Sequence, residues 1–140
     1  MIRYKRLDEN SLKLIRSLWI NLQDYHQSLN SDLPYISFEL CTEMLLRKTF
    51  TVYTAWSQKH IVGFCIPSIN KDQTGIIESL FVQGNFRHKK IGTTLFKKSL
   101  AWLRRQNIER IHIGVVYGNT KIFPFYEKFG FRPQAYILRN

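Results

Sequence analysis

The chain has 140 residues, of which 44% are hydrophobic, and it carries a formal net charge of +11 at pH 7. A chain of this length builds one domain with its own packed core, which excludes wholesale disorder and a need for disulfides or metal in folding. Residues 1–8 are too charged for a signal peptide, and no apolar run approaches the roughly 18 residues of a membrane helix, so we expect a cytoplasmic protein without a membrane partner.

The hydrophobic pattern predicts, in chain order, a strand, two helices, three strands, a helix, a strand, a helix and a final strand. These elements are expected over residues 1–7, 9–27, 37–48, 51–56, 61–66, 76–82, 91–106, 110–116, 119–129 and 131–138. We expect Ser37 to cap the second helix and Gly130 to end the last one. A strand–helix–strand unit after an antiparallel run predicts a mixed α/β (α+β) sheet with helices on both faces, in a single domain over residues 1–140.

The cysteines and histidines predict neither a disulfide framework nor a metal site. Cys41 and Cys65 are the only cysteines, and both lie in apolar surroundings, which is typical of buried thiols in a reducing compartment. The four histidines show no metal-ligand spacing, so we expect no metal.

The positive charge is distributed unevenly along the chain. No lysine or arginine occurs between residues 17 and 46, a stretch that contains Asp24, Asp32, Glu39 and Glu43. The excess of cations elsewhere suits an anionic partner, which is a phosphorylated cofactor, a nucleic acid or an acidic surface. A purely solubilising surface charge is the alternative.

The junction between the strand at 76–82 and the helix at 91–106 indicates an anion site. The first N–H groups of a helix have no internal partner, and the helix dipole adds partial positive charge there, so a pyrophosphate fits. Gly92 permits a close approach to the backbone, and Arg87, Lys89 and Lys90 add charge. An ordinary helix start in a basic protein is the alternative.

A motif at this junction resembles the cofactor motif of the GNAT acetyltransferase superfamily, Gln/Arg-x-x-Gly-x-Gly/Ala after a strand ending in Val. Here it reads Arg87-His-Lys-Lys90-Ile-Gly92 and follows Val82. Lys90 occupies the first glycine position, which requires no glycine if the φ angle there is negative.

A second motif of the same superfamily lies downstream. It is an Asn followed seven residues later by a Tyr and then by Gly-Phe, and this chain has Asn119, Tyr126 and Gly130-Phe131 at the matching spacing. The resemblance covers residues 51–131 well, whereas the first 50 residues match only in the order of their elements.

The resemblance implies an N-acetyltransferase that moves the acetyl group of acetyl-CoA directly to a primary amine of a small molecule or peptide, without an acyl-enzyme. The residues expected to bind the cofactor are Leu80, Phe81, Val82, Arg87, His88, Lys89, Lys90, Ile91, Gly92, Thr93 and Asn119. The strand residues among them would offer backbone groups to the pantetheine amides. Asn119 is also expected to cap the helix at 119–129.

Two residues are expected to be catalytic. Tyr126 resembles the general acid of the family, and a phenol can donate a proton to the leaving thiolate; a core aromatic is the alternative. An unpaired carboxylate in an apolar strand is costly, so Glu78 either serves as the general base or is satisfied by a nearby lysine or backbone group. Some family members place a base on the fifth strand, and the absence of an acid at 111–117 favours Glu78.

The acidic stretch is expected to face the acceptor. The first two helices form the acceptor side in the family layout, so Asp24, Tyr25, Tyr35 and Phe38 are expected to bind a cationic amine. A solvated helix face is the alternative for these residues.

Cations recur on one face of the helix at 91–106, which leaves other functions open. Lys90, Lys97 and Arg104 lie seven residues apart, with Lys98 and Arg105 beside them. This face is a solvated surface, a clamp for the cofactor's 3′-phosphate, or a contact with RNA. The alternative functions are an RNA-associated protein, with an aminoacyl-tRNA as acceptor, and a catalytically silent CoA-binding domain.

The last residues of the sequence determine how many strands the sheet is expected to have and whether a second subunit lends one. Family members usually finish with two strands after the Gly-Phe motif, and only residues 132–140 follow Phe131 here. We therefore expect a six-stranded sheet, or a seventh strand lent by a second subunit, in a monomer or a homodimer.

Overall fold

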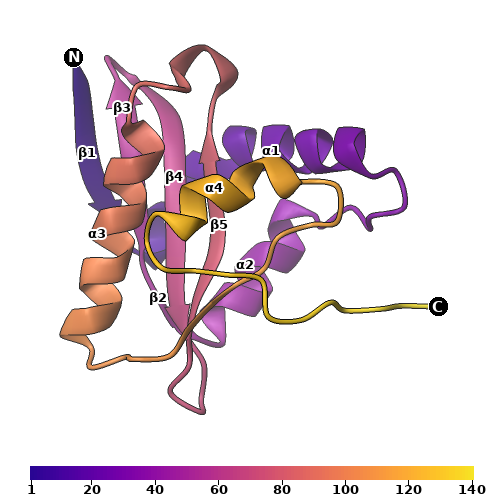
Figure 1. Cartoon of the computed structure of the whole chain (residues 1–140). Helices are drawn as coiled ribbons and strands as arrows, with labels where there is room; N and C mark the ends of the chain where they lie inside the picture. The colour runs from indigo at the N-terminus through magenta and orange to yellow at the C-terminus, as the bar shows by residue number, and fades with distance from the viewer.

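The computed structural model describes all 140 residues (Figure 1). Its strands are β1 (Ile2–Leu7), β2 (Thr49–Phe50), β3 (Val52–Ser57), β4 (His60–Ile69), β5 (Gly75–Val82) and β6 (Ile111–Ile113). Its α-helices are α1 (Arg16–Leu29), α2 (Phe38–Leu46), α3 (Ile91–Arg105) and α4 (Phe123–Glu127). Three 3-10 segments, η1 (Glu9–Ile15), η2 (Gly84–Phe86) and η3 (Thr120–Ile122), precede α1, α3 and α4.

The six strands form one mixed sheet, which confirms the predicted fold class. The strand order is β1-β3-β4-β5-β6, and β2 pairs with β4. All pairs are antiparallel except β5 with β6, because the chain crosses over through α3 between these two strands. The site described below forms where β5 and β6 meet the start of α3.

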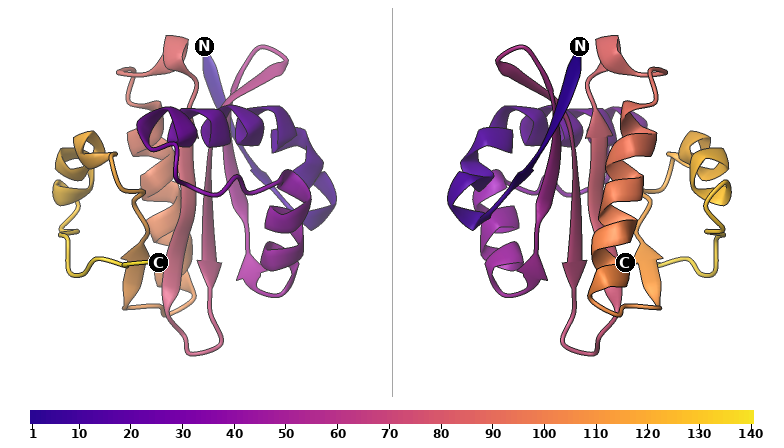
Figure 2. Two further views of the ribbon diagram at one scale, coloured as in Figure 1. Left: turned by 90° about the vertical axis from the view of Figure 1, so that its right-hand side faces the viewer. Right: turned by 90° about the vertical axis from the view of Figure 1, so that its left-hand side faces the viewer.

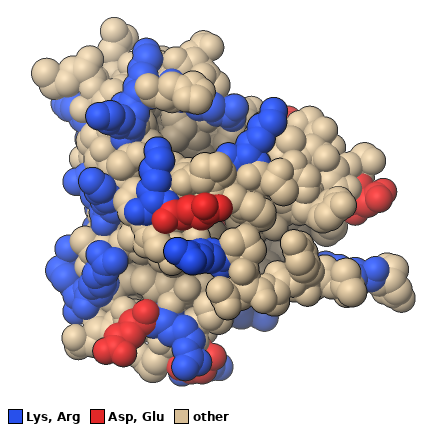
Figure 3. Space-filling model, viewed as in Figure 1, with Lys and Arg blue, Asp and Glu red and all other residues tan.

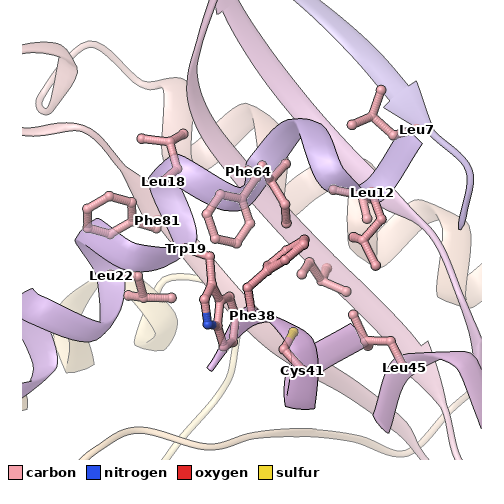
Figure 4. Packing of buried hydrophobic residues seen from close by; sticks show 13 residues of the cluster. Leu7, Leu12, Leu18, Trp19, Leu22, Phe38, Cys41, Leu45, Phe64 and Phe81 are labelled. Atoms are coloured by element: carbon pink, nitrogen blue, oxygen red, sulfur yellow. The ribbon is translucent and has the colours of Figure 1, made fainter. Parts of the chain in front are cut away.

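Helices cover both faces of the sheet (Figure 2). On one face η1, α1 and α2 enclose a core that contains Trp19, Phe38, Phe64 and Phe81 (Figure 4). Beside this core the indole N–H of Trp19 donates to the Ile36 carbonyl oxygen at 2.9 Å, which links α1 to the segment just before α2. None of the helices is long and apolar enough to cross a membrane.

On the opposite face α3 and α4 form a second core. The predicted inward residues of α3, which are Leu95, Phe96, Leu100 and Leu103, are all buried. Burial of such side chains stabilises the fold by roughly 2 kcal/mol each, so α3 is firmly seated on the sheet. The ring of Phe96 contacts the ring of Tyr126, with centroids 5.4 Å apart, and this packing positions the tyrosine of the second motif.

β5 is irregular at Glu78. Ile66 pairs with Ser79 and Pro67 with Ile77, so Glu78 is an extra residue in the strand and forms a β-bulge. β6 pairs with β5 only as far as Ile77, and the two strands then diverge. Bulges occur often beside active sites, because they redirect a side chain out of the regular alternation.

Several predicted elements differ from the structure. Residues 131–138 do not form a strand, because Pro133 lacks an N–H group and no strand lies beside this segment, whose end runs away from the body (Figure 1). The sixth strand is instead the short β2. The strand expected at 110–116 is confined to Ile111–Ile113, because β6 leaves β5 after these residues. The first helix opens as the 3-10 segment η1, which the side chain of Asp8 caps.

Candidate active site

A cavity of about 560 Å³ opens where β5 and β6 diverge. Its walls come from β5, from the start of α3, from α1 and from the segment that contains η3 and α4. The predicted site residues among its lining are Tyr25, Glu78, Leu80, Phe81, Val82, Arg87, His88, Lys90, Ile91, Gly92, Thr93, Asn119 and Tyr126. Both sequence motifs therefore meet in one cavity, although 26 residues separate Gly92 from Asn119 in the chain.

The first turn of α3 presents uncapped N–H groups to this cavity. The structure records no side-chain cap at Lys90 and no acidic residue in the first turn, and Ile91, Gly92 and Thr93 line the cavity. A Cβ added at Gly92 would make only ordinary contacts, 3.7 Å from Val82 and 3.9 Å from Phe125. Because the protein's own packing does not require a glycine here, the residue is best explained by the approach of a ligand.

The backbone at Lys90 does not meet the condition under which this position requires no glycine. That condition is a negative φ angle, whereas Lys90 has φ 63° and ψ 14°, in the left-handed region that favours glycine. The neighbouring His88 also has a positive φ, of 63°. The position therefore has the backbone of the family's glycine but carries a lysine side chain.

The open edge of β5 carries backbone groups without a strand partner. The N–H of Gln83 donates to Val62 on the β4 side, so the alternation along a strand turns the backbone groups of Leu80 and Val82 toward the cavity. Phe81 has the opposite orientation: its backbone faces β4, and its ring is buried in the core beneath α1. Leu80 and Val82 are thus the residues positioned to pair with an extended ligand.

The side chain of Arg87 lies beside the end of this open edge of β5. Its Nε donates to the Val82 carbonyl oxygen at 2.9 Å. Its guanidinium carbon lies 5.0 Å from the ring centre of Tyr25 and 5.5 Å from that of Phe81. A cation–π contact thus links Arg87 to α1. Lys89, by contrast, is exposed over the Phe86 ring and does not line the cavity.

Tyr126 is 8% exposed and lines the cavity. Its hydroxyl has no hydrogen-bond partner in the protein. Every fully buried side-chain polar atom does have a partner, so the Tyr126 hydroxyl oxygen is not fully buried and reaches the accessible surface. Burial, aided by the nearby Cys65, raises the pKa of Tyr126 above its ordinary value. The phenol therefore stays protonated at neutral pH and can donate into the cavity.

Glu78 has found partners, as one of the two sequence interpretations required. Its Oε2 accepts from Lys48 Nζ at 2.7 Å and from Ser68 Oγ at 2.5 Å. The side chains of Glu78 and Lys48 are each 24% exposed. Both hydrogen bonds end on Oε2, and Glu78 also lines the cavity.

Asn119 does not cap the helix, which corrects the sequence prediction. It occupies the N-cap position of η3, but its side chain makes no capping hydrogen bond, because its backbone has φ −103° and ψ 45° rather than an extended conformation. Asn119 instead lines the cavity.

The predicted acceptor residues are largely elsewhere. Tyr25 lines the cavity, but Asp24 and Tyr35 are exposed outside it. Phe38 packs in the core between α1 and α2, because the first turn of α2 points it inward, so it does not contact a ligand. The acidic stretch provides no carboxylate to the cavity, and Glu39 instead pairs with Arg16.

Sequence reasoning missed several residues of the site. Lys48 and Ser68 lie 30 and 10 residues from Glu78, and only the tertiary fold brings them to it. His26 of α1 also lines the cavity, and burial lowers its pKa. Only Ser68 could have been found from the sequence. If the strand predicted at 61–66 had been extended to Ser68, the antiparallel pairing would have placed that residue near Glu78.

The two cysteines lie outside the cavity and are not activated. Burial, helped by the Glu78 carboxylate, raises the pKa of Cys41 to about 12. Burial also raises the pKa of Cys65 to about 12. Neither thiol is therefore a nucleophile at neutral pH. A second cavity, of about 510 Å³, lies between the end of α3, β6 and residues 129–134 and contains none of the predicted site residues.

Comparisons with known proteins agree with this geometry. The sequence model of the acetyltransferase (GNAT) family matches residues 15–131. No curated protein sequence matches the chain.

Solved structures resemble the fold at low sequence identity. An acetyltransferase of Clostridium acetobutylicum with acetyl-CoA has a TM-score of 0.77 and 17% identity over 100% of this chain and 96% of its own. A GNAT acetyltransferase of Staphylococcus aureus Mu50 has a TM-score of 0.75 and 19% identity over 94% and 85%. An aminoglycoside acetyltransferase from an uncultured soil metagenomic sample, in complex with sisomicin, has a TM-score of 0.70 and 15% identity over 99% and 93%.

Proposed function

This chain belongs to the GNAT acetyltransferase family, and on that premise we propose that it moves the acetyl group of acetyl-CoA directly to a primary amine of a small molecule or peptide. One observation carries the proposal: a single cavity joins the uncapped start of α3, the open edge of β5, Tyr126 and Glu78. An anion site, a strand edge, an acid and a base are the parts that this transfer requires.

The cavity fits the co-substrate in two places. The N–H groups of the first turn of α3, with Arg87 and Lys90, suit a pyrophosphate. The backbone groups of Leu80 and Val82, with the amide of Asn119, suit the amides of a pantetheine arm. Structural neighbours were crystallised with acetyl-CoA or CoA, which supports this assignment.

Glu78 is proposed as the base. The acceptor arrives as an ammonium ion and must lose a proton before its nitrogen attacks the acetyl carbonyl carbon. The carboxylate of Glu78 accepts this proton, directly or through water, while Lys48 and Ser68 hold Oε2. Glu78 afterwards releases the proton to solvent.

Tyr126 is proposed as the acid. As the carbon–nitrogen bond forms and the carbon–sulfur bond breaks, the phenol donates its proton to the leaving sulfur. Burial keeps the pKa of Tyr126 high, so the phenol is protonated when the reaction begins and recovers a proton from solvent afterwards. The thiols of Cys41 and Cys65 have raised pKa values and do not line the cavity, which supports direct transfer without an acyl-enzyme.

Tyr126→Phe tests the proposal, because it removes the hydroxyl and keeps the ring that packs on Phe96. We expect turnover to fall by roughly 100-fold or more, while the dissociation constant for acetyl-CoA changes little. Free thiol released in the presence of a panel of amines measures turnover, and calorimetry measures binding. The matched control is Tyr117→Phe, which alters an exposed tyrosine outside the cavity.

The outcomes separate the possible functions. Unchanged turnover in Tyr126→Phe would remove it as the acid but leave the family assignment intact. Binding of acetyl-CoA without transfer to any amine would favour a silent cofactor-binding domain. Absence of binding at millimolar acetyl-CoA would refute the proposal altogether.

A further inference from the structure

The cations in the second half of α3 have no role in the cavity. Lys97, Lys98, Arg104 and Arg105 are exposed, and none of them lines the cavity. Their position therefore does not support a clamp on the cofactor's 3′-phosphate. Neither of the two ion pairs in the chain involves α3, so these charges are not neutralised within the protein.

Aromatic residues of β1 and β3 connect this helix face to Arg6. Lys98 Nζ lies 5.6 Å from the ring centre of Tyr4, and Arg105 Nη2 donates to the Tyr53 hydroxyl at 3.3 Å. Arg6 stands opposite Tyr53 in the β1–β3 register, and its Nε donates to Thr51. We call the resulting surface the basic band, which consists of Arg6, Lys97, Lys98, Arg104 and Arg105.

Acidic residues are few around the basic band, and the nearest one after it in the chain is Glu109, which lines the second cavity together with Arg104. Residues 79–108 contain seven lysines or arginines and no aspartate or glutamate. α3 packs on β3, β4 and β5, and the one acid of these strands, Glu78, is paired with Lys48. Figure 3 shows lysine and arginine side chains gathered on the side of the molecule where α3 lies. The same view shows acidic side chains beside basic ones at the lower end of this side, whereas α1 and α2 hold the Arg16–Glu39 ion pair.

The chemistry of the basic band narrows the class of partner. A large protein interface has an apolar centre, and an amphipathic helix binds a membrane through an exposed apolar face. The apolar face of α3 is buried in the core, and no large exposed apolar residue lies on α3. A cationic surface without apolar anchors instead suits a ligand with closely and regularly spaced anions, which is a sugar–phosphate backbone.

We propose that the basic band binds the phosphate backbone of a nucleic acid without reading its sequence. Lys97 and Arg104 of the band lie on the same row of the helix as Lys90, which lines the cavity. Along the helix axis Lys90 is about 21 Å from Arg104. A nucleic-acid strand bound along this row therefore approaches the cavity without filling it. The proposal does not depend on acetyl transfer.

A charge-matched pair of variants tests the proposal. Lys97→Gln with Arg104→Gln removes two charges from the basic band, and Lys59→Gln with Lys71→Gln removes two from exposed turns. Both double variants lower the formal net charge of +11 equally. Fluorescence anisotropy with a labelled single-stranded RNA of roughly 15 nucleotides measures binding across a salt series, with saturating acetyl-CoA present.

The expected result is specific to the basic band. Five phosphate contacts predict a slope of about −3.5 for log K against log salt, and the band variant should lose about 1.4 of that slope and at least tenfold in affinity. The turn variant should bind as the parent does, and both should keep the parent's affinity for acetyl-CoA and thermal midpoint. A duplex DNA arm identifies which nucleic acid binds better.

Three results would overturn the proposal. One is an equal loss of affinity in both double variants, which would mean that net charge alone attracts RNA. Another is the loss of RNA binding when acetyl-CoA is added, which would place the RNA in the cavity. The third is binding to phosphatidylserine vesicles without binding to either nucleic acid.

Discussion

Lys90 has a backbone conformation that favours glycine, and its side chain is a cation that can bind an anion. A non-glycine residue in the left-handed region costs roughly 1–2 kcal/mol. A cation at the N-terminal end of a helix is also placed unfavourably with respect to the helix dipole. Both costs are offset only when an anion occupies the first turn of α3, so the residue favours ligand binding at the expense of the empty protein.

Lys90→Gly should therefore stabilise the empty protein. We expect the free energy of unfolding to rise by about 1 kcal/mol, because removal of the backbone strain outweighs the greater freedom of glycine in the unfolded chain. Urea denaturation without acetyl-CoA measures this change. The matched control is Lys89→Gly, at a residue that does not have a positive φ, where stability should fall. A less stable Lys90→Gly variant would contradict the strain argument.

At the scale of elements, the contacts of Glu78 join three parts of the fold. The bulge of β5 turns its carboxylate toward the end of α2, where Lys48 follows the helix, and Ser68 belongs to β4. The pair is only partly exposed, so its Coulomb attraction is screened less than that of a surface ion pair. These contacts fix the carboxylate where the sheet opens, and in doing so they orient the proposed base.

A double-mutant cycle measures this link. Lys48→Met should lower the free energy of unfolding by roughly 1–3 kcal/mol, because it leaves the Glu78 carboxylate without its cation. Glu78→Gln together with Lys48→Met should cost less than the sum of the two single changes, by at least about 0.5 kcal/mol. Strictly additive effects in thermal or urea unfolding would show that the pair contributes nothing to stability.

Elements with strong local patterns could be predicted from sequence, and those that depend on distant partners could not. The buried row of α3 and the cap at Ser37 depend only on nearby residues, and the structure confirms both. The segment 131–138 has strand-forming residues, but a strand requires a neighbour, and the sequence does not show that none lies beside it. The same reason hid the Lys48–Glu78 pair and the burial of Phe38.

At the scale of the whole molecule, the last six residues stand apart from the domain. Residues 131–140 form no regular structure, and the side chains of Tyr136, Ile137 and Leu138 are 82–92% exposed. Their burial cannot contribute to stability in the single chain. Neither core includes residues 135–140, whereas the ring of Phe131 packs on that of Phe96, with centroids 5.7 Å apart.

Removal of residues 135–140 should therefore leave the single-chain fold intact. We expect a change of less than about 0.5 kcal/mol in the free energy of unfolding, because the deletion removes no buried contact. Guanidinium denaturation of the shortened and full chains at equal concentration measures this. A large loss of stability that grows with protein concentration would instead mean that these residues pack in an assembly of two chains.

The hydrogen bond between Arg87 and the Val82 carbonyl has a kinetic consequence. In the empty protein the guanidinium occupies an acceptor on the strand edge that an extended ligand would use, and its stacking on Tyr25 holds it there. We therefore expect acetyl-CoA to bind in two stages, in which the ligand first collides with the protein and the Arg87–Val82 hydrogen bond then breaks. The observed association rate constant should level off as ligand concentration rises, at a ceiling set by how often this hydrogen bond breaks rather than by diffusion.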